Sequence, residues 1–134
     1  MLKDKFKVET LPITKNFLRE KRYIEERGEL VLLSDSDEIR HITYFSLNPG
    51  KDFFRGGHYH KKKTEKFYVV SGKLNVFIVD VNTQERDSVD LIAGQRMTIC
   101  PFLAHKFQAI TESHVIEYYA SIYDIDDDVR FTDF

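Results

Sequence analysis

The chain has 134 residues, of which 42% are hydrophobic and 31% charged, and its formal net charge is −2 at pH 7. This length fits a single domain, residues 1–134, and 11 Phe and 7 Tyr supply enough apolar surface to argue against disorder. The near-neutral charge argues against a nucleic-acid partner, one cysteine rules out an internal disulfide framework, and no apolar run approaches the roughly 20 residues that span a bilayer. We therefore expect a cytoplasmic protein that binds neither nucleic acid nor membrane.

Strand signals dominate the chain. Residues 1–13 alternate weakly between polar and apolar side chains and predict an edge strand, whereas the charged residues 14–27 fit either a helical turn or a solvated loop. From Gly28 onwards, short runs of strand-forming residues alternate with turn residues. The expected strands are 29–33, 41–47, 53–60, 66–71, 73–81, 88–92, 97–100, 106–111 and 114–122. The acidic segment 123–130 is expected to form a solvated helical cap or coil.

About ten short strands and no long segment of helical periodicity predict an all-β barrel or sandwich of the jelly-roll kind. The apolar edge segment 6–13 offers a strand that could pair with a second chain, which favours a homodimer.

Histidines gather in the segment 57–65. His58 and His60 are two residues apart, so on a strand their side chains share a face. The lysine corner that follows, expected to be solvated, can fold Glu65 back beside them, and a separate strand supplies His105. Three histidines and a glutamate inside a barrel can hold one divalent metal (Zn, Fe, Ni or Mn). An isolated H-x-H pair is usually two surface histidines, but the accompanying residues favour a site.

These residues resemble the two cupin motifs. The first motif, G-x-H-x-H-x4-E-x6-G, matches residues 56–72 with its spacing intact. The second combines a glycine, a proline and a histidine, here Gly94, Pro101 and His105, with Ala104 as a shifted small residue. The resemblance implies a single cupin barrel with the ligands inside, and it is specific for fold rather than for chemistry.

Three further stretches are similar to one cupin branch, the sugar-nucleotide isomerases and epimerases, and most of all to the WxcM-like dTDP-4-keto-6-deoxyhexose 3,4-ketoisomerases. They are E-R-G-E-L at 26–30, R-G-G-H-Y-H-K at 55–61, and A-S-I-Y-D at 120–124 followed by V-R-F-T-D-F at 129–134. Two positions depart from the branch. It commonly has Trp where this chain has Ala104, and it often has Gln where this chain keeps Glu65.

The resemblance implies an enzyme that moves a ketone between C4 and C3 of a dTDP-4-keto-6-deoxyhexose through an enediol. A neutral imidazole suits such proton transfers, so His58 or His60 is the expected base. Tyr123 is a candidate proton donor, or else a tyrosine at the edge of the core. Arg55 is a candidate for bidentate binding of the diphosphate, or else forms a surface salt bridge.

Three functions stay open at this point. The first is the sugar-nucleotide isomerase or epimerase that works with histidines alone. The second is a metal-dependent cupin enzyme, an oxygenase or epimerase on another small molecule, with His58, His60, Glu65 and His105 as ligands. The third is a non-catalytic carbohydrate-binding cupin. Metal content separates the first two, and turnover of a dTDP-4-keto sugar separates the first from the third.

Overall fold

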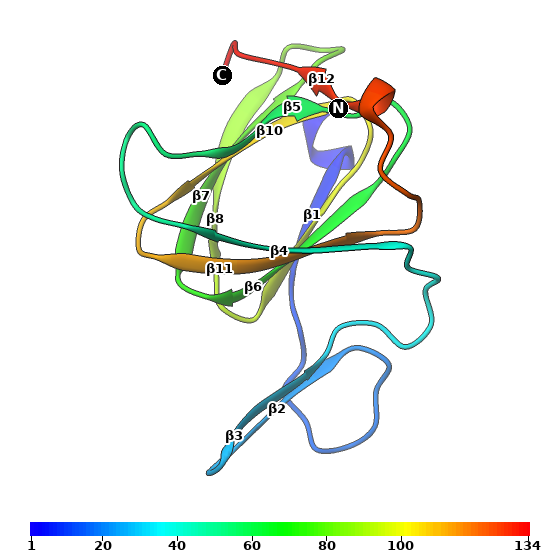
Figure 1. The fold of residues 1–134 in the computed structure, drawn as a ribbon, viewed down its shortest axis with the longest axis vertical. Helices are drawn as coiled ribbons and strands as arrows, with labels where there is room; N and C mark the ends of the chain where they lie inside the picture. Colours follow the sequence, from blue (N-terminus) through cyan, green and yellow to red (C-terminus); the bar gives the residue numbers. More distant parts are fainter.

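The computed structural model describes all residues 1–134 and is nearly all β (Figure 1). Its strands are β1 (Phe6–Thr10), β2 (Lys21–Glu25), β3 (Gly28–Leu32), β4 (His41–Leu47), β5 (Arg55–Tyr59), β6 (Glu65–Ser71), β7 (Lys73–Asp80), β8 (Arg86–Ile92), β9 (Gln95–Ile99), β10 (Leu103–Ala109), β11 (Ser113–Tyr119) and β12 (Val129–Arg130). Two short 3₁₀ turns, η1 (Leu2–Asp4) and η2 (Ile125–Asp127), complete the elements. No helix in the structure has the length and apolar character needed to cross a membrane.

Ten strands form two five-stranded sheets. The first has the order β1-β9-β6-β11-β4, and the second has the order β12-β5-β10-β7-β8. The two sheets face each other as an open sandwich, with the β2–β3 hairpin extending away from it (Figure 1). The prediction of an all-β jelly roll of about ten strands is confirmed, although the sheets do not close into a complete barrel.

A cluster of 13 buried hydrophobic residues fills the space between the sheets. The first sheet contributes Val69 and Val115, and the second contributes Val76, Ile78 and Phe107, all at most 1% exposed. Alternate residues of each strand point inwards, and burial of each such side chain contributes about 1.5–3 kcal/mol. This rigid interior supports the functional side chains.

The prediction was undecided for one segment and wrong for another, and the structure defines both. Within residues 14–27, Lys21–Glu25 forms β2, which pairs antiparallel with β3, and Arg22 and Glu29 add an ion pair of 2.9 Å between the two strands. The hairpin contacts the sandwich through a few residues, since Lys21 is 9% exposed and Val31 packs against the small cluster of Leu11, Tyr68 and Tyr118. The tail is not simply solvated, because η2 buries Asp127 to 4% exposure and β12 joins the second sheet.

Candidate active site

The first part of the site is built where β5 meets β10. His58 lies opposite His105 in the antiparallel register, beside an irregularity that follows His105. Gly56 has a φ of +85°, and a Cβ there would come within 2.7 Å of the His105 carbonyl oxygen. The glycine therefore allows the two backbones to approach closely and places both imidazoles on the inner face.

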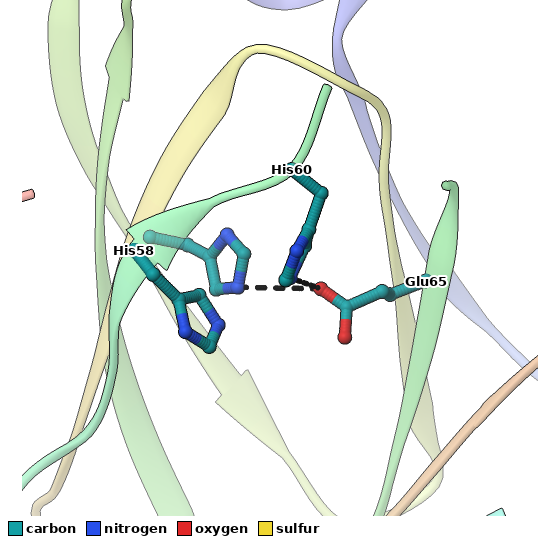
Figure 2. Close-up of side chains that lie close together, drawn as sticks. His58, His60 and Glu65 are labelled. Atoms are coloured by element: carbon teal, nitrogen blue, oxygen red, sulfur yellow. Dashed lines mark ion pairs between the residues drawn. The ribbon is translucent and has the colours of Figure 1, made fainter. Parts of the chain in front are cut away.

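Four side chains converge inside the sandwich. One nitrogen or oxygen from each of His58, His60, Glu65 and His105 lies within 4.8 Å of the others. Glu65 Oε1 is 2.8 Å from His60 Nε2 and 3.4 Å from His105 Nε2. Figure 2 shows His58 and His60 projecting from one segment, with Glu65 facing them from a strand of the other sheet. The structure thus brings together the four residues that the sequence singled out.

In each of the three histidines, the Nδ1 atom lies within hydrogen-bonding distance of an oxygen atom. His60 Nδ1 lies 2.6 Å from the Asp127 carbonyl oxygen, and His105 Nδ1 lies 3.0 Å from the Leu103 carbonyl oxygen. Since a carbonyl oxygen only accepts, both Nδ1 atoms carry the proton and donate. His58 Nδ1 lies 2.9 Å from an Asp128 carboxylate oxygen. These contacts fix the ring orientations and leave Nε2 of His60 and His105 facing Glu65.

Burial and neighbouring charges shift the pKa values of the three histidines in different directions. Complete burial lowers the pKa of His105 to about 4, so this ring is neutral at pH 7. Burial also lowers the pKa of His58, an effect that the charge of Asp128 opposes. For His60, burial would lower the pKa, but the nearby charge of Glu65 outweighs it and raises the pKa. Burial would raise the pKa of Glu65, but His60 and His105 together lower it. The His60 ring and the Glu65 carboxylate thus lie as a close buried pair, with Nε2 and Oε1 2.8 Å apart.

Glu117 belongs to the same cluster and was missed by the sequence analysis. Burial, together with the hydrogen bond and charge of Glu65, raises the pKa of Glu117 to about 8, so its carboxyl group is protonated at pH 7. No motif contains this residue. A signal existed nevertheless, because Glu117 follows the buried Val115 by two residues and so lies on the inner face of β11.

A cavity of about 200 Å³ opens beside the cluster, and we call it the histidine cavity. Its lining residues are Thr43, Phe45, Arg55, Gly56, His58, Phe67, His105, Phe107 and Glu117. The rings of Phe67 and Phe107 each lie 5.9 Å from the His105 ring, which gives the cavity an apolar floor. His58 faces this cavity, whereas His60 lies behind it and is only 3% exposed.

Of the two remaining candidate residues, Arg55 lines the histidine cavity and Tyr123 does not. Arg55 stands at the rim of the histidine cavity, forms no ion pair with a carboxylate, and donates from Nη2 to the Ser46 carbonyl oxygen at 3.2 Å. The surface salt bridge considered for it is not formed. Tyr123 lies beyond the end of β11, is 54% exposed, and does not line the cavity. Its position gives no support to a role as proton donor.

The C-terminal segment anchors the histidine segment. The buried Asp127 carboxylate accepts hydrogen bonds from the backbone N–H groups of Lys61, Lys62 and Lys63, at 2.7, 3.0 and 3.2 Å. The lysine corner predicted to be solvated is therefore fixed through its backbone. Four of the five residues 124–128 are aspartates, so nothing in the sequence marks which of them is buried.

Comparison with known proteins places this geometry in context. Residues 23–128 match the family model described as the polysaccharide biosynthesis C-terminal domain. The chain belongs to this family. No curated protein matches the sequence. The match of this polysaccharide biosynthesis domain covers both motif segments and the strand that carries Glu117.

Solved structures of sugar-nucleotide enzymes share the fold of this polysaccharide biosynthesis domain. A 3,4-ketoisomerase from Helicobacter canadensis has a TM-score of 0.73 and 18% identity, with 93% of this chain and 90% of that chain covered. The TDP-quinovose 3,4-ketoisomerase WlaRB from Campylobacter jejuni has a TM-score of 0.72 and 18% identity over 93% and 92%. The dTDP-4-dehydrorhamnose 3,5-epimerase from Sulfolobus tokodaii has a TM-score of 0.72 and 19% identity over 96% and 83%. These likenesses confirm the cupin-like fold that the motifs predicted.

Proposed function

We propose that this protein is a nucleotide-sugar isomerase or epimerase, and specifically that it moves a ketone between C4 and C3 of a dTDP-4-keto-6-deoxyhexose. The observation that carries the proposal is His58, which faces the histidine cavity while Asp128 holds its other side. The shared fold supports it. One similar structure, 18% identical, is a histidine-to-asparagine variant of the 3,4-ketoisomerase QdtA from Thermoanaerobacterium thermosaccharolyticum in complex with TDP-4-keto-6-deoxyglucose.

The chemistry requires a base beside the sugar ring. The C3–H bond of a 4-keto sugar is acidified by the neighbouring carbonyl, and a neutral imidazole can remove that proton. The electron pair of the C–H bond forms the C3–C4 double bond, and the C4 oxygen takes up a proton to give the enediol. Loss of the O3 proton and protonation at C4 then give the 3-keto isomer. His58 suits the base because burial keeps its ring neutral, whereas His60 is engaged with Glu65.

Turnover assays test this assignment. We expect His58→Asn to lower turnover of dTDP-4-keto-6-deoxyglucose by about 10²–10⁴-fold, the typical contribution of general acid–base catalysis. His60→Asn should also abolish turnover, because it breaks the pair with Glu65. His114→Asn is the matched control, since His114 lies on β11 near the surface and pairs with Glu112 outside the cavity. Product formation is followed by proton NMR, and retention of fold by circular dichroism.

A second candidate, a metal-dependent enzyme, is favoured by three buried polar atoms that have no hydrogen-bond partner. These atoms are His60 Nε2, Glu65 Oε1 and His105 Nε2, and all three point to one centre. Two imidazole nitrogens and a carboxylate are suitable donors for zinc, iron, nickel or manganese, and His58 would complete the set. When bound, such an ion supplies Lewis-acid polarisation of a substrate oxygen.

Elemental analysis and chelation decide between the two candidates. Stoichiometric metal in protein purified without added metal, together with loss of turnover on chelation, supports the metal-dependent enzyme. Turnover that survives chelation but is lost in His60→Asn supports histidine acid–base chemistry. If neither chelation nor the histidine variants affect turnover, the assignment of the reaction to this histidine cluster is wrong, and absence of turnover in the wild-type protein contradicts the proposed function. Absence of any turnover with retained sugar binding supports the carbohydrate-binding alternative.

A homodimer is part of the proposal. β1 is an edge strand, with β9 on one side and no partner strand on the other. Such a free edge can pair with another chain. Light scattering at working concentration should give twice the monomer mass, and a clean monomer contradicts the dimer.

A further inference from the structure

The two walls of the histidine cavity come from different sheets. The second sheet supplies the wall that carries His58 and His105, and the first sheet supplies the wall that carries Thr43 and Glu117. The cavity measures about 200 Å³, whereas pockets for drug-sized ligands typically measure about 300–1,000 Å³. It therefore fits a single sugar ring, with His58 on one side of the ring and Glu117 on the other.

Glu117 stands on the inner face of the first sheet because of the register of β11. It lies opposite Thr43 of β4 and opposite Phe67 of β6, two residues after the fully buried Val115. A carboxyl group in this position loses much of its hydration, whereas a leucine would pack there without that cost. The core therefore gives no reason for a glutamate on this wall, and its place beside the cavity points to a ligand.

The carboxyl group of Glu117 keeps hydrogen-bonding capacity for such a ligand. It forms a hydrogen bond with Glu65, and since a carboxyl group has two oxygens, one stays available. The neighbouring Thr43 is less available, because its hydroxyl oxygen already lies 2.6 Å from His41 Nε2. The available Glu117 oxygen can accept a hydrogen bond from a sugar hydroxyl in either charge state of the carboxyl group.

Three phenylalanines make the rest of the lining apolar. The ring centres of Phe67 and Phe107 are 4.8 Å apart, and those of Phe45 and Phe107 are 6.0 Å apart. A 6-deoxyhexose is divided in a similar way, because its C6 methyl group and its 2-hydroxyl group lie at opposite ends of the ring. With the methyl group packed on the phenylalanines, the 2-hydroxyl is turned towards Glu117.

We propose that Glu117 binds the 2-hydroxyl of the hexose and thereby determines which sugars the cavity accepts. The 3-hydroxyl is consumed in the proposed reaction, since its oxygen becomes the new ketone, so the 2-hydroxyl is the group that can keep one contact throughout. Glu117 is then a specificity-determining residue and takes no part in the proton transfers. This inference rests on the proposed function, because it assumes that the hexose occupies the histidine cavity.

Calorimetry with two ligands that cannot isomerise tests this role. dTDP-6-deoxyglucose has a hydroxyl in place of the C4 ketone, and dTDP-2,6-dideoxyglucose lacks the 2-hydroxyl as well. We expect the wild-type protein to bind the first roughly 5- to 150-fold more tightly, the effect of leaving one buried polar group unpaired. Glu117→Leu and Glu117→Ala should both lose this preference. Glu117→Gln keeps an acceptor oxygen and should retain it.

Two controls separate recognition of the sugar from a general effect on the fold. TDP has no hexose, so its affinity should be the same in the wild-type protein and in all Glu117 variants. Glu112→Leu is the matched control variant, since Glu112 is exposed and pairs with His114 outside the cavity, and it should keep the preference for the 2-hydroxyl.

The outcomes distinguish this inference from the proposed function. Equal wild-type affinity for the two nucleotide sugars, or a preference that persists in Glu117→Leu, overturns the role of Glu117 even if the protein turns over a keto sugar. Failure of the wild-type protein to bind either nucleotide sugar, or an equal loss of TDP binding in Glu117→Leu, overturns it as well. A preference that depends on Glu117 without any isomerase turnover supports the role and contradicts the proposed reaction.

Discussion

The Asp127 carboxylate binds the backbone of residues 61–63, which follow β5. Replacing Asp127 therefore measures how much these hydrogen bonds contribute to the free energy of unfolding. The carboxylate is 4% exposed and accepts three backbone hydrogen bonds, while the same residue's carbonyl accepts from His60. A hydrogen bond to a charged group contributes about 1.5–3 kcal/mol. Water can replace part of this interaction at the exposed Lys61 and Lys62, so the sum must be discounted.

We expect Asp127→Ala to cost about 3–5 kcal/mol of unfolding free energy, since it leaves several partly buried N–H groups unpaired. For a chain of this length, that corresponds to a fall in Tm of roughly 10–20 °C. Asp127→Asn keeps one acceptor oxygen and should cost only about 1–2 kcal/mol.

Thermal unfolding followed by circular dichroism measures these differences, with Asp126→Ala as the control. Asp126 is the exposed neighbour in η2, and its side chain makes no hydrogen bond to the lysine corner. If Asp127→Ala unfolds at the same temperature as Asp126→Ala, the carboxylate does not anchor the corner and the reasoning is refuted. A separate loss of isomerase turnover in Asp127→Asn, without loss of stability, would point instead to a direct effect on His60.

Three further perturbations test other parts of the structure. Asp128→Asn weakens the hold on His58 and should lower kcat by roughly 10- to 100-fold while KM changes little; an unchanged kcat in steady-state assays excludes that role. Burial would raise the pKa of Asp80, but the 2.7 Å ion pair with Lys5 and two backbone N–H groups lower it. This stabilisation is therefore present above about pH 4 and is lost as pH falls through the folded pKa, so urea titrations should show wild type and Asp80→Asn converging in acid. Gly72→Ala places a Cβ 2.3 Å from a backbone oxygen at a φ of +94°, and should cost at least about 2 kcal/mol in the same titrations; a neutral effect contradicts the close approach.

Local patterns predicted the strands and the central part of the site. The two-residue spacing of His58 and His60 is a property of any strand, and the corner that returns Glu65 is only a few residues long. The boundaries of β4, β6 and β7 fall within about one residue of expectation for the same reason. Such features depend on neighbours in the chain and are visible in one sequence.

The residues that orient the site could not be predicted, because they arrive from far away in the chain. Asp127 lies 67 positions after His60, and Asp128 reaches His58 only because β12 pairs with β5. Glu117 meets Glu65 through the pairing of β11 with β6. Contacts of this kind follow from how sheets stack, and an aspartate-rich tail has no local pattern that selects one residue for burial.

The anchoring of the histidine segment by η2 has a consequence for how the protein is made. The His60 ring lacks its fixing carbonyl until the ribosome has added the 67 residues that separate it from Asp127. At about 5–20 residues per second, that interval is several seconds, during which the nascent sandwich has its first motif but cannot orient the rings. The orientation of the His60 ring is therefore fixed only after η2 has been made, when strands β1 to β11 have already been synthesised.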